Sequence, residues 1–220
     1  MKLNRRDLML KSLGAVGIAA AGSEALAQAV CGLTPQQPEG PFYPIDNQLD
    51  KDNDLTRVQG AVARPQGQLI YVRGVVTDQN CLPVAGALVE IWQACHTGKY
   101  NHKSDPNPAP LDPNFQYWGQ AITDAQGRYM FKTILPGAYP ASSTWMRPPH
   151  IHYKISKRAY AELITQLYFK NNPLNNKDLI LNALPAAERA KVIVELTAPE
   201  QGYDPGSKIA TFNITLKRLA

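Results

Sequence analysis

One short segment of the chain reads Trp145-Met146-Arg147-Pro148-Pro149-His150-Ile151-His152-Tyr153-Lys154-Ile155, and the residues after its prolines are typical of a β-strand. Successive strand side chains point to opposite faces, so His150 and His152 share a face, with Cα atoms about 6.5 to 7 Å apart. That spacing allows both imidazoles to reach a single ion. Because proline cannot lie in a central ladder, we expect the strand to start near His150, with Arg147 at its mouth. Two half-exposed strand histidines without a ligand are the alternative interpretation.

Further strands are predicted wherever the chain is β-branched and aromatic or alternates in polarity. These segments are residues 69–77, 87–92, 121–123, 128–131, 163–169 and 209–216. Turn-like residues 78–83 join the first two segments, which predicts a hairpin between them. Only residues 186–194 look helical. Many short strands without a strand–helix rhythm predict an all-β fold, an antiparallel β-sandwich with long loops and at most one short helix.

The beginning of the chain has the pattern of an export signal. Residues 4–8 contain paired arginines, residues 13–21 are apolar, and residues 25–27 offer small side chains for cleavage. The apolar run is too short for a membrane span. We therefore predict a twin-arginine signal peptide at residues 1–27 and an exported, periplasmic mature chain from about Gln28. A cytosolic amphipathic N-terminus is the alternative.

Charge and cysteine content narrow the class of protein. The chain has a formal net charge of +5, and the predicted signal contributes four basic and two acidic residues, which leaves +3 for the mature chain. Without a run of basic residues, we predict neither a nucleic-acid nor a membrane partner, whereas an anionic small molecule would suit the charge. The scattered Cys31, Cys81 and Cys95 do not suggest a zinc site, and an oxidising compartment would permit one disulfide with one thiol left over. The sequence leaves open which two cysteines pair.

The residues before the first strand are interpreted as an extended N-terminal arm, residues 28–67, followed by a β-sandwich domain, residues 68–220. The arm is rich in Pro, Asp, Asn and Gln and has no sustained period. Within it, Glu39-Gly40-Pro41-Phe42-Tyr43-Pro44 is either a turn that caps the domain's hydrophobic edge or part of a site. Residues 101–114 carry four prolines among Asn and Asp, which predicts a long surface loop.

Two tyrosines, Tyr100 and Tyr139, each lie where a predicted strand gives way to a loop. With the motifs around them, the sequence resembles the intradiol ring-cleavage dioxygenases, and among these the iron-bearing subunits of the protocatechuate 3,4-dioxygenase type. The matching runs are Val89-Glu90-Ile91-Trp92-Gln93-Ala94, Gly98-Lys99-Tyr100, His102-Lys103, Pro110-Leu111-Asp112-Pro113-Asn114-Phe115, Pro136-Gly137, Tyr139-Pro140, Arg147-Pro148, His150-Ile151-His152 and residues 163–169. The resemblance covers roughly residues 68–175, and such a set in one order is more specific than any single run.

This resemblance implies a non-haem Fe(III) ion held by Tyr100, Tyr139, His150 and His152. Ferric iron is hard and strongly charged, so it lowers a phenol pKa from about 10 and keeps tyrosine as an oxyanion. Two histidines with a nearby carboxylate would instead have indicated a ferrous facial triad. The remaining tyrosines and histidines near these motifs, interpreted as core, rim or loop residues, are Tyr129, Tyr153, Tyr168, His96 and His102.

The resemblance also implies an activity, the cleavage of a protocatechuate-like catechol with O2 to a cis,cis-muconate. It gives Tyr139 a second role as the base that deprotonates the catechol, and Arg147 the role of stabilising charge that develops on the substrate. Gln166 and Trp92 match residues that line the substrate pocket. Tyr43 corresponds to a residue at the mouth of that pocket, although the arm aligns poorly with the family. Core packing is the alternative interpretation of Trp92.

Two features depart from the protocatechuate type or leave its properties open. Residues 140–146 form a segment about two residues shorter than expected and lack the expected basic and amide residues, so the identity of the catechol is open. The chain is too short to contain the helical N-terminal dimerisation region of catechol and hydroxyquinol dioxygenases, which disfavours these two types. Because protocatechuate enzymes pair this subunit with an iron-free one, we expect a homo- or hetero-oligomer.

The alternative function is a non-catalytic exported β-sandwich module that binds an aromatic ligand or a protein partner.

Overall fold

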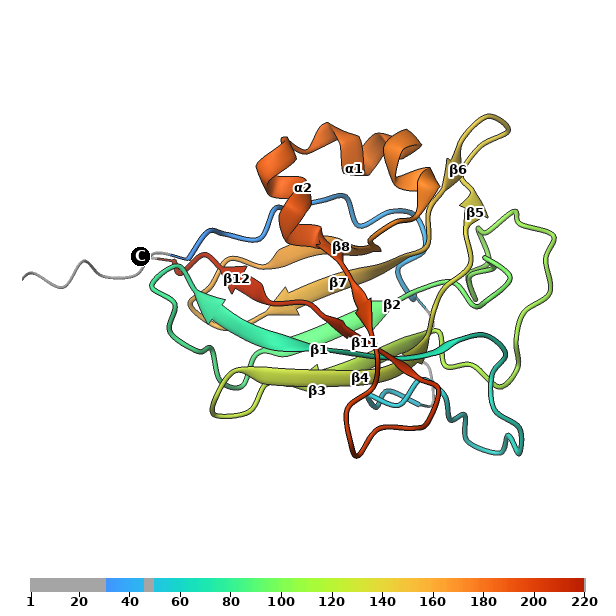
Figure 1. The fold of residues 1–220 in the computed structure, drawn as a ribbon, viewed down its shortest axis with the longest axis horizontal. Helices are drawn as coiled ribbons and strands as arrows, with labels where there is room; N and C mark the ends of the chain where they lie inside the picture. Colours follow the sequence, from blue (N-terminus) through green and yellow to red (C-terminus); the bar gives the residue numbers. More distant parts are fainter. Residues whose placement is uncertain (1–30, 46–49, 220) are drawn as a thin grey trace, which may run out of the picture.

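The protein folds as a β-sandwich of two five-stranded sheets in the computed structural model, which describes residues 31–45 and 50–219 (Figure 1). The predicted signal peptide lies outside the described residues. The first sheet contains β1 (Leu69–Asp78), β4 (Arg128–Ile134), β10 (Leu196–Thr197), β11 (Lys208–Thr211) and β12 (Ile214–Leu216). The second contains β2 (Leu88–Trp92), β3 (Trp118–Ile122), β7 (His150–Ser156), β8 (Leu163–Phe169) and β9 (Ile193–Val194). The predicted all-β sandwich is therefore confirmed, with antiparallel pairing in the longest ladders and short parallel pairings of β1 with β11 and β12 and of β8 with β9.

The hydrophobic core lies between the two sheets and uses one face of each strand. On β7, Ile151, Tyr153 and Ile155 are fully buried in this core, whereas His150 and His152 point to the other face. Phe131 on β4 reaches the same core from the first sheet. The strand alternation thus leaves the histidine face of the second sheet available for other chemistry.

The predicted hairpin between residues 69–77 and 87–92 is wrong. β1 pairs with β4, β11 and β12, whereas β2 pairs with β3 and β7, so the two strands belong to different sheets. Asp78 ends β1, and its carboxylate accepts hydrogen bonds from the backbone N–H of Asn80 and Leu82 in the turn that leads to the second sheet. A local sequence pattern identifies a strand, but packing between distant segments determines which strand it pairs with.

The helical part of the chain follows β8 and lies beside it (Figure 1). It consists of the 3-10 helix η1 (Pro173–Lys177), α1 (Leu179–Ala183) and α2 (Ala186–Val192). α2 confirms the helix predicted at residues 186–194, although its last two residues form β9, and the single turns η1 and α1 precede it. Asn172 caps η1 and Asp178 caps α1 through their side chains. Among the described residues, no helix is long and apolar enough to cross a membrane.

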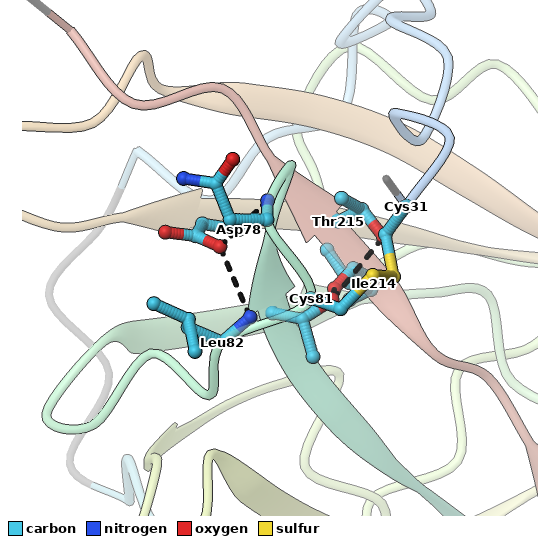
Figure 2. The surroundings of a disulfide bond; sticks show 8 residues. Cys31, Asp78, Cys81, Leu82, Ile214 and Thr215 are labelled. Atoms are coloured by element: carbon cyan, nitrogen blue, oxygen red, sulfur yellow. Dashed lines mark hydrogen bonds between the residues drawn. A yellow bond between two sulfur atoms is a disulfide. The ribbon is translucent and has the colours of Figure 1, made fainter. Parts of the chain in front are cut away.

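The described part of the arm contacts strands of both sheets and is fixed at its start by a disulfide. Cys31 forms a disulfide with Cys81 in the turn after β1, and Figure 2 shows this bond beside β12. Thr34 then donates its backbone N–H to Thr215, and Gln37 donates its own to Ile164 on β8. The structure thus identifies the cysteine pair, and Cys95 is the buried free thiol.

A two-stranded ribbon completes the described strands. It is formed by β5 (Tyr139–Pro140) and β6 (Met146–Arg147), and the loop between them projects from the molecule (Figure 1). Tyr139 pairs with Arg147 in this ribbon. The ribbon therefore brings the second predicted tyrosine next to the segment that leads into the histidine strand.

Candidate active site

The candidate site occupies the outer face of the second sheet, away from the main core. Trp92 on β2 pairs with His152 on β7, which pairs with Gln166 on β8. Opposite residues in neighbouring strands point to the same face, so these three side chains form one row. His150 and Tyr168 form the next row. The ladder register thus gathers residues that lie far apart in the sequence.

The structure brings together the four side chains predicted to hold a metal. His150 Nε2 lies 3.2 Å from His152 Nε2 and 3.5 Å from the Tyr100 hydroxyl. The rings of Tyr100 and Tyr139 are 5.3 Å apart at 86°, and the Tyr139 ring is 5.6 Å from that of His150. All four residues are at most 4% exposed. Two phenols and two imidazoles therefore converge in a pocket from which bulk water is excluded.

Two glycine-containing loops set the spacing of the tyrosines. Gly98 lies two residues before Tyr100, and Gly137 lies two residues before Tyr139. Gly98 has φ +83°, and a Cβ atom there would collide with the carbonyl of Ala138. A Cβ atom on Gly137 would likewise collide with the backbone of Gly98. The loops thus approach backbone to backbone, which requires glycine at both positions.

The hydrogen bonds of His150 define its tautomer. Its Nδ1 lies 2.7 Å from the carbonyl oxygen of Pro148, which can only accept, so Nδ1 carries the proton. The Nε2 lone pair then points toward His152 and Tyr100, as in histidines that bind metals. His152 stacks on Trp92 with rings 4.9 Å apart, and its buried Nδ1 has no partner among the described residues.

Burial sets the protonation states of these four side chains. It raises the pKa of Tyr100 well above its usual value, and Tyr139 adds to this effect. Burial also raises the pKa of Tyr139, against the opposing charge of Arg147. Burial and Arg147 together hold the pKa values of His150 and His152 well below the usual range. Both imidazoles are therefore neutral and can offer a nitrogen lone pair to a metal ion. The phenols would ionise only next to a strongly charged cation.

The donor set fits a ferric ion. Two nitrogen ligands at about 2.1 Å from one ion lie roughly 3.0 to 3.4 Å apart, and the 3.2 Å between the two Nε2 atoms falls within this range. Phenolate oxygens are hard, anionic ligands that suit a hard, highly charged ion. No group of three His, Cys, Asp or Glu side chains gathers within residues 31–45 and 50–219, so a metal at this site would need the tyrosines.

Arg147 lies beside the candidate ligands, and its side chain is 2% exposed. Its Nη1 donates to His150 Nε2 at 3.1 Å. Its Nη2 donates to Gln166 Oε1 at 2.8 Å and to the Tyr168 hydroxyl at 3.0 Å. Burial opposes its charge, but hydrogen bonds to Asp178 outweigh this effect and raise the pKa of Arg147. A permanent positive charge therefore faces the site.

The predicted pocket residues lie around this centre. Gln166 is fully buried and contacts Arg147 directly. The Trp92 ring, which covers one face of His152, meets the Tyr43 ring edge to face at 5.0 Å. Tyr43 donates to Glu90 at 3.1 Å, and burial together with Glu90 raises the pKa of Tyr43 to about 12. Trp92 is thus both packed and in contact with a candidate ligand.

Sequence reasoning missed two residues in or around the site, Gln37 and Asp178. Gln37 donates to the backbone oxygen of Gln166 at 3.0 Å. Phe42, from the segment 39–44 that the sequence offered as part of a site, packs on Tyr100 with ring centroids 4.7 Å apart. Asp178 forms an ion pair with Arg147. An Asp before an apolar run signals a helix cap, but the sequence holds no signal that pairs this cap with an arginine 31 residues earlier.

The other tyrosines and histidines near the motifs lie in the main core, in the Arg147 network or in loops. Tyr129 and Tyr153 lie in the main core between the sheets. Tyr168 is also buried, but its hydroxyl belongs to the Arg147 network. His96 and His102 lie in loops. A hollow of about 760 Å³ is lined by residues of β1, β3, β4 and β11, Tyr129 among them, and contains none of the residues predicted to bind the metal or the substrate, all of which are described.

Comparison with known proteins agrees with this geometry. A family model described as Dioxygenase matches residues 38–218. The protocatechuate 3,4-dioxygenase beta chain of Burkholderia cepacia is 40% identical over 183 residues, which are 80% of this chain and 76% of that protein. Catechol 1,2-dioxygenase of Candida albicans (strain SC5314 / ATCC MYA-2876) is 34% identical over 154 residues, 64% of this chain. The match spans 48% of that protein's length.

A solved structure extends the similarity to the fold. The dioxygenase domain of a dioxygenase carbohydrate-binding protein fusion from Streptomyces sp. SirexAA-E aligns with a TM-score of 0.64 and 26% sequence identity. The alignment covers 86% of this chain and 100% of that chain. The overall fold is therefore similar over most of the chain.

Proposed function

The chain belongs to the intradiol ring-cleavage dioxygenase family, and we therefore propose that it is a non-haem Fe(III) enzyme that cleaves a protocatechuate-like catechol with O2 to a cis,cis-muconate. The observation that carries the proposal is the convergence of Tyr100, Tyr139, His150 and His152 beside the buried guanidinium of Arg147. When bound, ferric iron would supply Lewis acidity that favours the deprotonated catechol and the reaction of its ring with O2.

Tyr139 is suited to receive a proton from the catechol. A phenol and a catechol hydroxyl have similar acidity, so a phenolate at this position is a competent base. Tyr139 lies on the two-residue strand β5, at the start of a projecting loop, and is 4% exposed. It can therefore move away from the centre at less cost than a side chain held within a long ladder.

Arg147 is suited to stabilise negative charge on the reacting ring. Its Nη1 faces the candidate ligands, and its surroundings exclude water, so its charge is weakly screened. Gln166 keeps the guanidinium in place from β8. These groups are already oriented before substrate arrives, which is the condition for efficient electrostatic stabilisation.

The 40% identity to a protocatechuate 3,4-dioxygenase beta chain supports a protocatechuate-like substrate. The same name implies a second type of chain, so we include a homo- or hetero-oligomer in the proposal. The twin-arginine pattern of the sequence supports export to the periplasm. The Cys31–Cys81 disulfide supports it too, because such bonds persist in oxidising compartments.

A binding module without catalysis is not favoured. Such a module has no need for two phenols that converge on two imidazoles, nor for a buried arginine beside them. Burial of polar groups is costly unless they are hydrogen-bonded, paired or bound to a metal ion, and the His152 Nδ1 has no hydrogen-bond partner among the described residues.

The experiment is to purify the protein with iron and to follow O2 uptake with protocatechuate and with catechol. We expect a burgundy protein, from tyrosinate-to-Fe(III) charge transfer, and one O2 consumed per ring opened. A higher kcat/KM for protocatechuate would support the substrate assignment. A colourless preparation that stays iron-free and inert after Fe(III) loading would exclude the enzyme.

A further inference from the structure

Arg147 and Asp178 form a buried ion pair at the edge of the candidate active site. Arg147 Nε donates to Asp178 Oδ2 at 2.9 Å, and Nη2 donates to Oδ1 at 3.3 Å. The two side chains are 2% and 0% exposed. A guanidinium and a carboxylate that meet through two parallel bonds restrict each other's orientation as well as their separation.

The donors of Arg147 can be assigned one by one. Nε and one N–H of Nη2 point to Asp178, and Nη2 also reaches Gln166 and Tyr168. Only Nη1 is left, and its contact is His150 Nε2 at 3.1 Å. Because the guanidinium is planar, fixing its Nε–Nη2 edge also fixes the direction of Nη1.

Asp178 is itself held by the helical segment. Its Oδ1 accepts the backbone N–H of Leu181 at 2.8 Å, which caps α1. Its backbone oxygen accepts the side-chain amide of Asn182 at 2.7 Å. The carboxylate therefore cannot follow Arg147 if the arginine moves, so it acts as a fixed reference for the guanidinium.

We propose that Asp178 is a positioning residue for ring cleavage, which orients Nη1 of Arg147 toward the reacting centre through this ion pair. The proposal rests on the dioxygenase function proposed above. Asp178 does not itself touch the candidate ligands' polar atoms; it acts through Arg147. It also compensates part of the charge of Arg147, which lowers the cost of burying the guanidinium.

The first test is Asp178→Asn, which keeps the shape and an acceptor for the α1 cap but removes the charge and one of the two acceptors. We expect normal iron content and an anaerobic Kd for protocatechuate within about threefold of wild type. The O2 reaction of the preformed complex should slow by roughly 10- to 100-fold, because the loss concerns the developing charge. Iron analysis, anaerobic optical titration and single-turnover mixing with O2 give these three readouts.

A double-mutant cycle separates positioning from general destabilisation. Arg147→Ala should slow the O2 reaction further than Asp178→Asn, and adding Asp178→Asn to Arg147→Ala should have little additional effect. Two losses that multiply would show that Asp178 acts independently of Arg147 and would overturn the proposal. Asp178→Asn with a wild-type O2 reaction would overturn it equally.

The matched control is Asn172→Ala, which removes the cap of η1 in the same segment without contact to Arg147. We expect a lower Tm and an unchanged O2 reaction. If Asp178→Asn fails to fold, Asp178→Glu retains the charge and shifts the carboxylate by one methylene. A slower O2 reaction with normal iron and Kd supports the proposal, and a wild-type rate contradicts it. Failure of the proposed function looks different, because wild-type protein would then be iron-free and inert.

Discussion

Tyr100 and Tyr139 carry the same phenol but have different surroundings. The backbone N–H of Tyr100 is held by the Asp105 carboxylate at 2.6 Å, within a loop fixed by further hydrogen bonds. Tyr139 belongs to the short ribbon with Arg147. This difference suits Tyr100 to remain in place during turnover and Tyr139 to move.

Tyr100→Phe should therefore lose most bound iron and its visible colour. Tyr139→Phe should retain more iron but deprotonate the catechol slowly, because it removes the base. Iron analysis and stopped-flow mixing with catechol under anaerobic conditions measure the two effects. If Tyr139→Phe bound the catechol as fast and as completely as wild type, the base role would be wrong.

The residues of the candidate site differ in how well the sequence could reveal them. His150 and His152 follow from strand alternation, and the structure brings them to one face, with Nε2 atoms 3.2 Å apart. Tyr100 and Tyr139 followed from motif resemblance, because nothing local shows that their loops meet. No local signal marks Asp178, because its partner Arg147 is set by the packing of η1 against β6.

At the scale of elements, the longer strands were predictable. The two-residue strands β5, β6, β9 and β10 were not, and neither were the partners of the strands. Residues 163–169 coincide with β8, whereas the C-terminal segment divides into β11 and β12. β1 and β2 are neighbours in sequence and lie in different sheets. Hydrophobic alternation reports burial of one face, and both sheets of a sandwich bury a face in the same core.

The contact between the two tyrosine loops is an element-scale feature that can be tested. Gly98→Ala should force the loops apart, cost roughly 1 to 3 kcal/mol of stability and reduce iron content. Gly206→Ala is the matched control, because Gly206 also has positive φ, +77°, but nothing lies within 4 Å of its added Cβ. Urea unfolding and iron analysis compare the two variants. Equal effects would show that φ alone, and not the loop contact, accounts for the loss.

An ion pair links the first sheet to the loop between β10 and β11 and predicts a pH effect. Lys132 and Tyr71 both hydrogen-bond Asp204 at 2.6 Å, and these bonds hold the pKa of Asp204 below its usual value. A lowered pKa adds stability above the unfolded pKa of about 3.9, and that stability is lost as the pH falls through the folded pKa.

Asp204→Asn should therefore be less stable than wild type at pH 7, by a small amount because the pair is partly exposed. The difference should shrink as the pH falls below about 4. Urea unfolding at pH 7, 5 and 3 measures it. A difference that grows toward low pH would contradict the assignment.

For the whole molecule, the main consequence of the fold is the separation of core and site. The core lies between the sheets, whereas the candidate site lies on the outer face of the second sheet and is covered by loops and by the arm. Phe42 and Tyr43 form part of that cover. The arm thus closes a site whose proposed ligands all come from the sandwich and its loops.

The Cys31–Cys81 disulfide anchors this arm and closes a sequence separation of 50 residues. In the chain-entropy model, a loop of that length contributes about 4 kcal/mol. Cys31→Ser and Cys81→Ser should therefore lower Tm by roughly 10 °C and raise KM for the catechol, because Phe42 and Tyr43 would be less firmly held. Iron content should stay close to that of wild type, because none of the four proposed ligands lies in the arm.

Thermal unfolding with and without reductant tests this coupling between arm and site. Reductant should lower the Tm of wild type toward that of the variants and leave both variants unchanged, because they already lack the bond. Since Cys31→Ser and Cys81→Ser break the same bond, they should behave alike in Tm and in KM. A variant with reduced Tm but wild-type KM would show that the disulfide stabilises the fold without shaping the site.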